Sequence, residues 1–466
     1  MVGSHPAGRI LRAILLLLTV SGCSAVSTRT GFHGPITDEL LRGDYQEASY
    51  QIEKARARGK YAKKDRLLYY LDSGAIYHYA GDTDSSNARL TMAEEAADDL
   101  FTKSISRAAG SLILNDNLLE YAGEDYEVLY TNLLMALNYI NLGAFDDAFV
   151  EIRRSNEKLD LLEQKYAQAA DELNSASEWD SDSVRIDYKA ANVRFYNDAF
   201  ARYLSMRMYA ADGKMDDAGI DYNYLTEAFT IQPNIYDFAL PEIRISPDSG
   251  TLLSVVALAG LSPVKESLNL RIRTDKDLDL VQVLYTDSEN KDVEYGHLPI
   301  PVNADYYFKF AIPKLVPRDS EVYEIRVYAD SRPIGQLGLI EDVSKVAEET
   351  FKAKSSLIYL RSVARAVAKG LAAHKAKRKA DTGGLDGWLK KAAIDVATDI
   401  SENADLRCAR YLPGKIYVGD FEIEPGVYDI EVAFLDSHGE EMKRISYARY
   451  EIKNSGLNLI ETSCLR

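Results

Sequence analysis

A short pattern that occurs three times in the first half of the chain restricts its fold more than any other feature. In each copy a glycine is followed five residues later by an alanine, and the copies are Leu41–Ala48, Leu142–Ala148 and Asp212–Ala218. A glycine in this position ends one helix, and the small alanine lets the next helix lie close against it. Apolar residues recur at helical spacing from Ile36 to about Pro233. The pattern therefore predicts stacked helix pairs, because one pair cannot bury its apolar face alone.

The same pattern resembles the turn and second helix of the tetratricopeptide (TPR) repeat. A fourth, degenerate copy surrounds Gly81, where Gly74 and Tyr77 take positions usually given to small and aromatic residues, but no alanine is in register. We therefore expect a TPR-like α-helical repeat domain over residues 36–236. The polar stretch 174–183 breaks the helical period and is expected to form an exposed loop.

An apolar run near the start of the chain determines where the protein is expected to work. The run follows Arg9 and Arg12 and is too short to span a bilayer, as in a secretory signal. It closes with four residues that resemble the lipobox of bacterial lipoproteins: Val20, Ser21, Gly22 and Cys23. In a lipobox the cysteine is acylated and cleavage leaves it as the first residue. The alternative is a plain secretory signal with a chance cysteine.

The lipobox resemblance divides the N-terminal part of the chain at the cysteine. Residues 1–22 are expected to be a lipoprotein signal peptide, and residues 23–35 a lipidated tether, since they are small, polar and glycine-containing. The residue after Cys23 is Ser24 rather than aspartate, which by resemblance to Gram-negative lipoproteins implies transport to the outer membrane. The expected location is therefore the outer membrane, with a lipid such as palmitate as the anchor and the protein facing the periplasm.

The second half of the chain changes from a helical to an alternating period near Leu240. Residues 237–466 are expected to form an antiparallel β-sandwich-like domain with a helical insertion at about 342–402. The expected strands cover residues 242–245, 252–258, 268–273, 280–285, 306–312 and 322–328, and, after the insertion, 408–411, 415–418, 427–435, 444–452 and 458–462. The predicted fold class is thus multidomain, α then β.

The charge balance and the remaining cysteines limit the partners and the covalent links of the chain. The formal charge is 55 − 72 = −17, so a nucleic-acid partner is not expected. Cys408 and Cys464 lie in one strand-rich segment of a protein directed to an oxidising compartment, so we expect a disulfide between them. Two separate buried thiols are the alternative, and geometry decides between the two.

The helical insertion reverses the local sign of charge. Its basic residues accumulate beside an apolar stripe and include Arg361, Arg365, Lys369, Lys375, Lys377 and Arg378. Such a helix suits an anionic surface, where each lysine contributes about 1 kcal/mol, or an acidic partner. The alternative is that the stripe packs on the β-sheet while the cations meet the acidic surface of the protein itself.

Residues around the second copy of the pattern form the expected partner-binding surface. If the repeat register around Gly143 holds, a concave inner face is lined by Tyr130, Leu133, Leu137 and Ile140. Such a face can bind a peptide or a partner helix, and the alternative is that these side chains pack against the neighbouring pair. Charged residues on the following helix, namely Glu151, Arg153 and Arg154, are either partner contacts or ion pairs on a solvated face.

Motifs of known catalytic chemistry are mostly lacking in the sequence. No HExxH pair, GxSxG elbow, P-loop or CxxC motif occurs, and the six histidines are scattered. We therefore expect neither a catalytic residue nor a cofactor or metal ion. A hydrolase whose residues converge only in three dimensions is the alternative from the enzyme class.

Longer stretches are similar to a family of bacterial TPR-containing outer-membrane lipoproteins for which no activity is established. The similar stretches are Tyr121–Glu127, Ala136–Tyr139, Ala148–Arg154, Ala199–Ser205 and Asp217–Tyr222, with Asp405, Arg407, Leu412 and Pro413 near the C-terminus. The resemblance implies a non-catalytic scaffold for envelope proteins. By gene context it also implies, as one alternative, an accessory or regulator of peptidoglycan synthesis that contacts cell-wall synthesis factors. A binder of anionic lipid or envelope glycan, acting through the basic helices, is another.

Overall fold

The computed structural model describes residues 31–107, 119–176, 195, 197–275, 277, 280–286, 292–298, 307–352, 355, 358–359, 362 and 404–466. Within these residues the first half of the chain is helical and the second half consists mainly of strands, so the predicted order of α then β is confirmed. The helices are α2 (His33–Arg42), α3 (Tyr45–Ala57), the short η2 (Lys63–Asp65), α4 (Arg66–Tyr79), α5 (Thr83–Arg107), α6 (Asp125–Asn141), α7 (Phe145–Ala176), α8 (Ala199–Ala211) and α9 (Met215–Ile231).

Four helix pairs share one kind of turn. In each turn a glycine adopts a left-handed conformation, with φ of 79° at Gly43, 73° at Gly81, 72° at Gly143 and 75° at Gly213. Each of these glycines donates its N–H to the carbonyl three residues earlier, and the next residue donates to the carbonyl five residues earlier. This arrangement satisfies the last carbonyls of the first helix and requires a residue without Cβ strain. The glycine pattern therefore marks the four helix turns, including the degenerate one.

The fifth residue after each turn glycine packs at the contact between paired helices. Ala48, Ala148 and Ala218 are fully buried there. In the second pair Ser86 takes this position, and its hydroxyl donates to the Gly74 carbonyl oxygen at 2.8 Å. Small side chains at these positions let the two helices of a pair approach closely.

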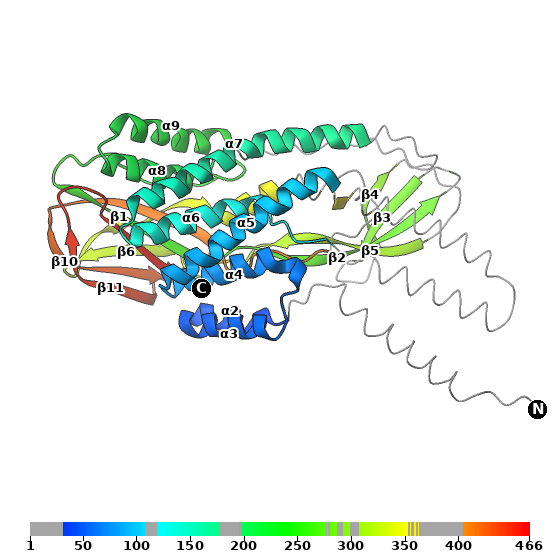
Figure 1. Cartoon of the computed structure of the whole chain (residues 1–466), viewed down its shortest axis with the longest axis horizontal. Helices are drawn as coiled ribbons and strands as arrows, with labels where there is room; N and C mark the ends of the chain where they lie inside the picture. Colours follow the sequence, from blue (N-terminus) through cyan, green and yellow to red (C-terminus); the bar gives the residue numbers. More distant parts are fainter. Residues whose placement is uncertain are drawn as a thin grey trace, which may run out of the picture.

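The strands of the described residues form three four-stranded sheets. They are β1 (Thr251–Leu261), β2 (Val264–Asp275), β3 (Leu280–Thr286), β4 (Asp292–Leu298), β5 (Tyr307–Val316), β6 (Glu324–Ala329), β7 (Arg332–Gln336), β8 (Gly338–Asp342), β9 (Pro413–Ile423), β10 (Gly426–Leu435), β11 (Glu441–Ile452) and β12 (Leu459–Cys464). The strand orders are β12-β1-β9-β8, β11-β10-β6-β7 and β4-β3-β2-β5. Among these described strands every pairing is antiparallel except that of β1 with β12, which run parallel. The third sheet extends to one end of the molecule (Figure 1).

The first sheet lies between the helices and the second sheet. Every residue of its strand β1 is buried. Alternate β1 residues such as Val255 and Ala257 join a core shared with the second sheet. The residues between them, Val256 and Leu258, join the core of the helical layer. A continuous apolar run is what a strand covered on both faces requires, so the helices and sheets pack as successive layers (Figure 1).

Two segments predicted as strands are irregular instead. Residues 242–245 and 408–411 form no ladder pairing. Their backbone amides are bound by side-chain carboxylates: Arg244 N–H by Asp420 at 3.2 Å, and Ala409 N–H by Glu127 at 2.7 Å. Those carboxylates replace the strand partner that an alternating sequence predicts. The predicted loop 174–183 is wrong at its start, since α7 continues through Ala176, and its later residues lie outside the described part.

The predicted helical insertion is described only at its beginning. Strand β8 ends at Asp342, and residues 343–352 are helical. Buried residues of this helix, among them Val343, Val346 and Ala347, belong to the core of the helical layer. The insertion thus begins as part of the packed body.

Candidate functional site

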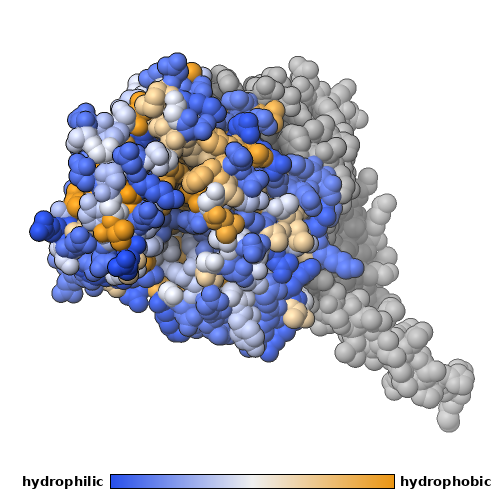
Figure 2. Space-filling view, turned by 60° about the vertical axis from the view of Figure 1, so that its left-hand side comes forward, coloured by the Kyte–Doolittle hydropathy of each residue, from blue (hydrophilic) through white to orange (hydrophobic). Residues whose placement is uncertain are grey.

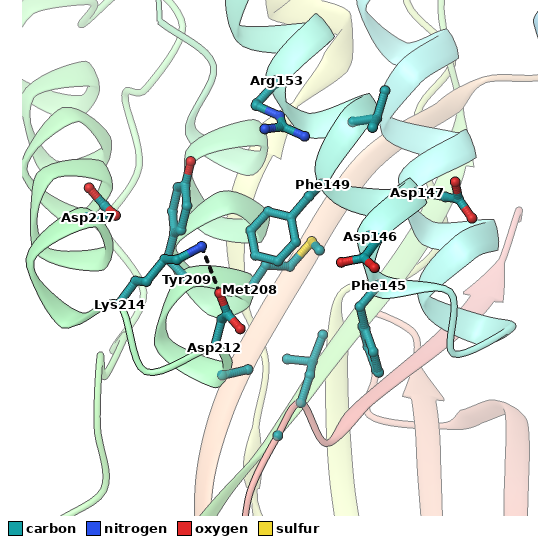
Figure 3. A pocket seen from close by; sticks show the side chains of 14 residues that line it. Phe145, Asp146, Asp147, Phe149, Arg153, Met208, Tyr209, Asp212, Lys214 and Asp217 are labelled. Carbon is teal, nitrogen blue, oxygen red and sulfur yellow. Dashed lines mark ion pairs between the residues drawn. The ribbon is translucent and has the colours of Figure 1, made fainter.

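A groove of about 630 Å³ lies between the turns of the α6–α7 and α8–α9 pairs (Figure 3). The first turns of α7 supply Phe145 and Phe149, and the end of α8 supplies Tyr209. The turn between β11 and β12 adds Gly456 and Leu457 to the lining. The groove therefore forms where two equivalent helix turns and one strand turn meet.

An aromatic pair and one cation occupy the middle of the groove. The Phe149 and Tyr209 rings lie side by side there, tilted by 47°, with centroids 5.3 Å apart (Figure 3). The Lys214 ammonium lies 5.7 Å from the Phe149 centroid and 5.9 Å from the Tyr209 centroid. It also pairs with the Asp212 carboxylate at 2.8 Å, and this hydrogen bond raises the pKa of Lys214. Lys214 thus stays charged beside two ring faces, which cation–π attraction favours.

Large apolar side chains remain exposed at the groove. Phe145 keeps 40% of its surface exposed and Val150 keeps 36%, although both are apolar residues at the start of a packed helix. Such residues are ordinary when scattered, but here they adjoin the aromatic pair. The face that Figure 2 turns forward likewise shows apolar surface gathered between hydrophilic side chains.

The rim of the groove is acidic. Four aspartates line the groove against two cations, Arg153 and Lys214, so the formal charge of its lining is 2 − 4 = −2; the aspartates are Asp146, Asp147, Asp212 and Asp217. Three of the aspartates stand in the first turns of α7 and α9, where a negative charge stabilises the helix end. They therefore serve the fold and also give the rim its charge. The polar side chains in the described lining are aspartate, arginine, lysine and tyrosine, which can pair charges and contact a ligand.

The four residues predicted to line a concave binding face are buried instead. The exposed fraction is 1% for Tyr130, zero for Leu133 and Leu137, and 7% for Ile140. Helix α6 packs between neighbouring helices and also contacts β12, so both of its sides are covered. The binding prediction for these residues is therefore wrong, and packing against neighbouring elements is confirmed.

The three predicted charged contacts on α7 separate into two groups. Glu151 is buried and accepts a hydrogen bond from Asn132 at 2.6 Å, while Arg154 pairs with Glu151 at 3.1 Å and with Glu94 at 3.0 Å. These two residues join neighbouring helices. Arg153 is exposed and lines the groove, so it alone of the seven candidates lies at the candidate site.

Two of the stretches named for the lipoprotein resemblance, Tyr121–Glu127 and the residues around Arg407, lie in a buried polar network. The Glu127 carboxylate accepts hydrogen bonds from the Tyr121 hydroxyl at 2.7 Å, from the Glu124 amide at 3.0 Å and from the Ala409 amide at 2.7 Å. Burial and the neighbouring Glu124 charge raise the pKa of Glu127. The Tyr121–Glu127 stretch thus attaches the irregular segment 404–412 to the helices, which is a role in the fold.

A second part of the same network centres on Arg407. Its guanidinium binds Asp405 through two hydrogen bonds of 2.8 and 2.7 Å, Asp65 at 2.9 Å and the Leu119 carbonyl at 2.9 Å. Nearby, burial raises the pKa of Asp72 to about 7, and this carboxylate accepts from the Tyr61 hydroxyl and the Arg410 amide.

Cys408 and Cys464 are separate buried thiols, and the predicted disulfide is not formed. Cys464 ends β12 and packs in the core between the first and second sheets. Cys408 belongs to the irregular segment, where its N- and C-terminal neighbours Arg407 and Ala409 bind helical residues. The two thiols therefore lie in different parts of the packed body, and burial raises the pKa of each.

Several predicted sites lie outside the described residues. They are the lipobox residues Val20, Ser21 and Gly22 with the lipidation site Cys23, and the basic residues Arg361, Arg365, Lys369, Lys375, Lys377 and Arg378. Across the described ranges, no group of three or more His, Cys, Asp and Glu side chains is arranged to hold a metal ion. No helix in the described part of the chain is long and apolar enough to cross a membrane.

Sequence reasoning missed the aromatic residues of the groove. Phe149 follows Gly143 by six residues and Tyr209 precedes Gly213 by four, so each was visible as part of a repeat copy. The contact between two copies is what makes the site, and a pattern within one copy does not reveal it.

A scan against protein-family models, a search of curated proteins and a search of solved structures each found no match.

Proposed function

We propose that the protein is a non-catalytic interaction scaffold of the cell envelope. In this proposal Cys23 carries the lipid that anchors the chain to the outer membrane, and the body faces the periplasm. The helix pairs present a surface to envelope proteins, and the strands give the helical layer a rigid support.

Two features of the fold support a TPR-like helical domain on a β-sandwich. The four helix pairs share the same glycine turn and carry a small buried residue five positions later, as tetratricopeptide repeats do. The first and second sheets face each other across one apolar core, which is the defining contact of a sandwich.

The observation that carries the proposal is the groove. It combines a partly exposed aromatic pair, exposed aliphatic and aromatic neighbours and an acidic rim at the meeting point of two helix turns. Protein interfaces typically place aromatic anchors at the centre and charged residues at the rim. A partner with an apolar anchor and basic flanks complements these features.

Affinity capture from envelope extracts tests the groove with a matched pair of variants. Phe145→Lys places a charge on an exposed apolar residue of the groove, and Leu161→Lys makes the same change on the same helix at a residue that does not line the groove and is 56% exposed. We expect Phe145→Lys to weaken capture of the specific partner by about tenfold or more, as at an interface hot spot. Leu161→Lys should behave like the wild type. Equal capture by both variants would remove the groove from the proposal.

A separate experiment tests the proposed lipid anchor and its outer-membrane location. Labelled palmitate should enter the wild-type protein, and Cys23→Ser should abolish both labelling and outer-membrane localisation. If Cys23→Ser localises unchanged, the anchor is wrong. A captured peptidoglycan synthase or its activator would specify the cell-wall alternative.

A further inference from the structure

A second pocket, remote in sequence from the groove residues, has an unusual set of charges. It has a volume of about 610 Å³ and lies where the first turn of α2 meets the start of β2 and the irregular segment 404–412. Its lining includes His33, Thr37, Arg318 and Arg410. A volume of this order falls within the roughly 300–1,000 Å³ of small-molecule sites.

Two arginines line this pocket. Arg318 is fixed by two backbone carbonyls: its Nε donates to Ser262 at 2.7 Å, and its Nη2 donates to the carbonyl of Arg410 itself. Both arginines are only partly exposed. No carboxylate among the described residues forms an ion pair with either of them, whereas the buried Arg202, Arg207 and Arg407 each have such a partner. The two acidic lining residues, Asp38 and Glu266, are exposed at the rim.

The positive charges in this pocket make it less favourable for one another to be charged. Burial, together with the Arg410 charge, lowers the pKa of Arg318 to about 10. Burial and the charges of Arg410 and Arg318 also hold the pKa of His33 well below its usual value. Positive groups that repel one another in a partly dry site are stabilised when an anion binds between them.

The N-terminal end of α2 lies at the same pocket. The helix has no acidic residue in its first turn, and its N-cap residue Phe32 makes no side-chain cap hydrogen bond. His33 is 4% exposed, and its Nδ1 lies 2.8 Å from the Tyr411 hydroxyl. The same residue lines the pocket. The dipole of α2 places partial positive charge at this end of the helix, which favours an anion.

We propose that this pocket binds a phosphoryl group. Guanidinium groups bind phosphate oxygens through charge-assisted hydrogen bonds, and the positive end of the α2 dipole adds to the attraction for an anion. The phosphoryl group comes either from a small soluble phosphate compound or from a phospholipid head group. If Cys23 is lipidated, the 33 − 23 = 10 residues to His33 span at most about 35 Å, so head groups are within reach. The proposal does not depend on the groove binding a partner.

Thermal unfolding of the purified mature chain with inorganic phosphate tests the proposal at constant ionic strength. We expect phosphate to raise the melting temperature of the wild type in a saturable way, because a ligand that binds only the folded state stabilises it. Arg410→Gln should weaken the phosphate affinity about tenfold or more, since a charge-assisted hydrogen-bond pair is lost. Arg332→Gln, at an exposed arginine of β7 outside the pocket, is the control and should match the wild type.

Additional variants and measurements identify the source of the phosphoryl group and separate lost binding from misfolding. Arg410→Lys keeps the charge but loses the fork, so its affinity should fall between those of the wild type and Arg410→Gln. Vesicles of phosphatidylcholine with phosphatidic acid should bind the wild type more than Arg410→Gln if a head group is the ligand. A phosphate response without vesicle binding indicates a soluble ligand. Equal phosphate responses in the wild type and Arg410→Gln, or none beyond that of sodium chloride, would overturn the proposal.

Discussion

Replacing Arg407 by alanine tests how the helices and the strand half of the chain are held together. Arg407 is 2% exposed and lies in the irregular segment that precedes β9. It binds Asp405 on its own segment, and Asp65 and the Leu119 carbonyl on the helical side. Its guanidinium also lies 5.2 Å from the centroid of the Tyr121 ring. The substitution removes all four contacts at once.

The magnitude follows from the charges that Arg407→Ala leaves behind. The carboxylates of Asp65 and Asp405 are 10% and 15% exposed, so neither can recover full hydration. Burial alone would raise the pKa of Asp405, but Arg407 holds it below its usual value, so this carboxylate is charged at neutral pH. Breaking a buried ion pair by removing one partner costs about 3–5 kcal/mol. We expect a loss of unfolding free energy in that range.

Urea unfolding followed by circular dichroism measures this loss. Arg42→Ala is the matched control, because Arg42 pairs with Glu39 at 2.8 Å but its side chain is 65% exposed, and an exposed pair contributes about 1 kcal/mol or less. A double substitution of Arg407 and Asp65 should cost less than the sum of the single changes, since the charge left behind is removed too. A loss below about 1 kcal/mol for Arg407→Ala would refute the reasoning.

The structure also predicts how three further substitutions change the stability of the protein. Gly74→Ala should destabilise by about 1–3 kcal/mol, because its Cβ would lie 2.6 Å from Leu90 Cδ2 across the α4–α5 contact. Gly219→Ala, with open space at the same atom inside α9, should instead stabilise by about 0.5–1 kcal/mol, and thermal melts of the two variants compare them directly. The third change concerns His78, whose Nε2 lies 2.5 Å from a carboxylate oxygen of Glu461. Burial lowers the pKa of His78, but the charge and hydrogen bond of Glu461 raise it by more, so the pKa is above its usual value. This pair stabilises the fold fully below about pH 6.5, and its contribution is lost as the pH rises through the pKa of His78 in the folded protein. Glu461→Gln should therefore flatten the pH dependence of the urea unfolding midpoint in that window. An unchanged pH profile would contradict this assignment.

The sequence predicts the helix turns well because their cause is local. Gly43, Gly81, Gly143 and Gly213 each need a left-handed conformation, and a glycine at that point of a helical period is a direct signal. The strands β1, β9 and β10 follow equally from their apolar periods. The strand β7 escaped prediction because its five residues are mostly exposed and include Pro333 and Gly335, so it has no apolar period to detect.

Features that depend on distant residues could not be predicted in this way. The apolar face of α6 is correct as a pattern, but only the positions of the neighbouring helices and of β12 show that it is covered and not a binding surface. Segment 408–411 alternates like a strand, yet carboxylates of the helical half bind its amides. The groove likewise needs Phe149 and Tyr209 from two repeat copies at once. A single sequence shows each residue but not which partner it meets.

Site-specific photocrosslinking in intact cells tests the proposed scaffold most directly. A photoreactive amino acid placed at Phe145 reports on the groove, and one at Leu161 reports on the exposed surface of the same helix outside it. The proposal predicts a discrete crosslinked product with an envelope protein from position 145 and none from position 161. No product from position 145, or the same product from both positions, would contradict a binding role for the groove.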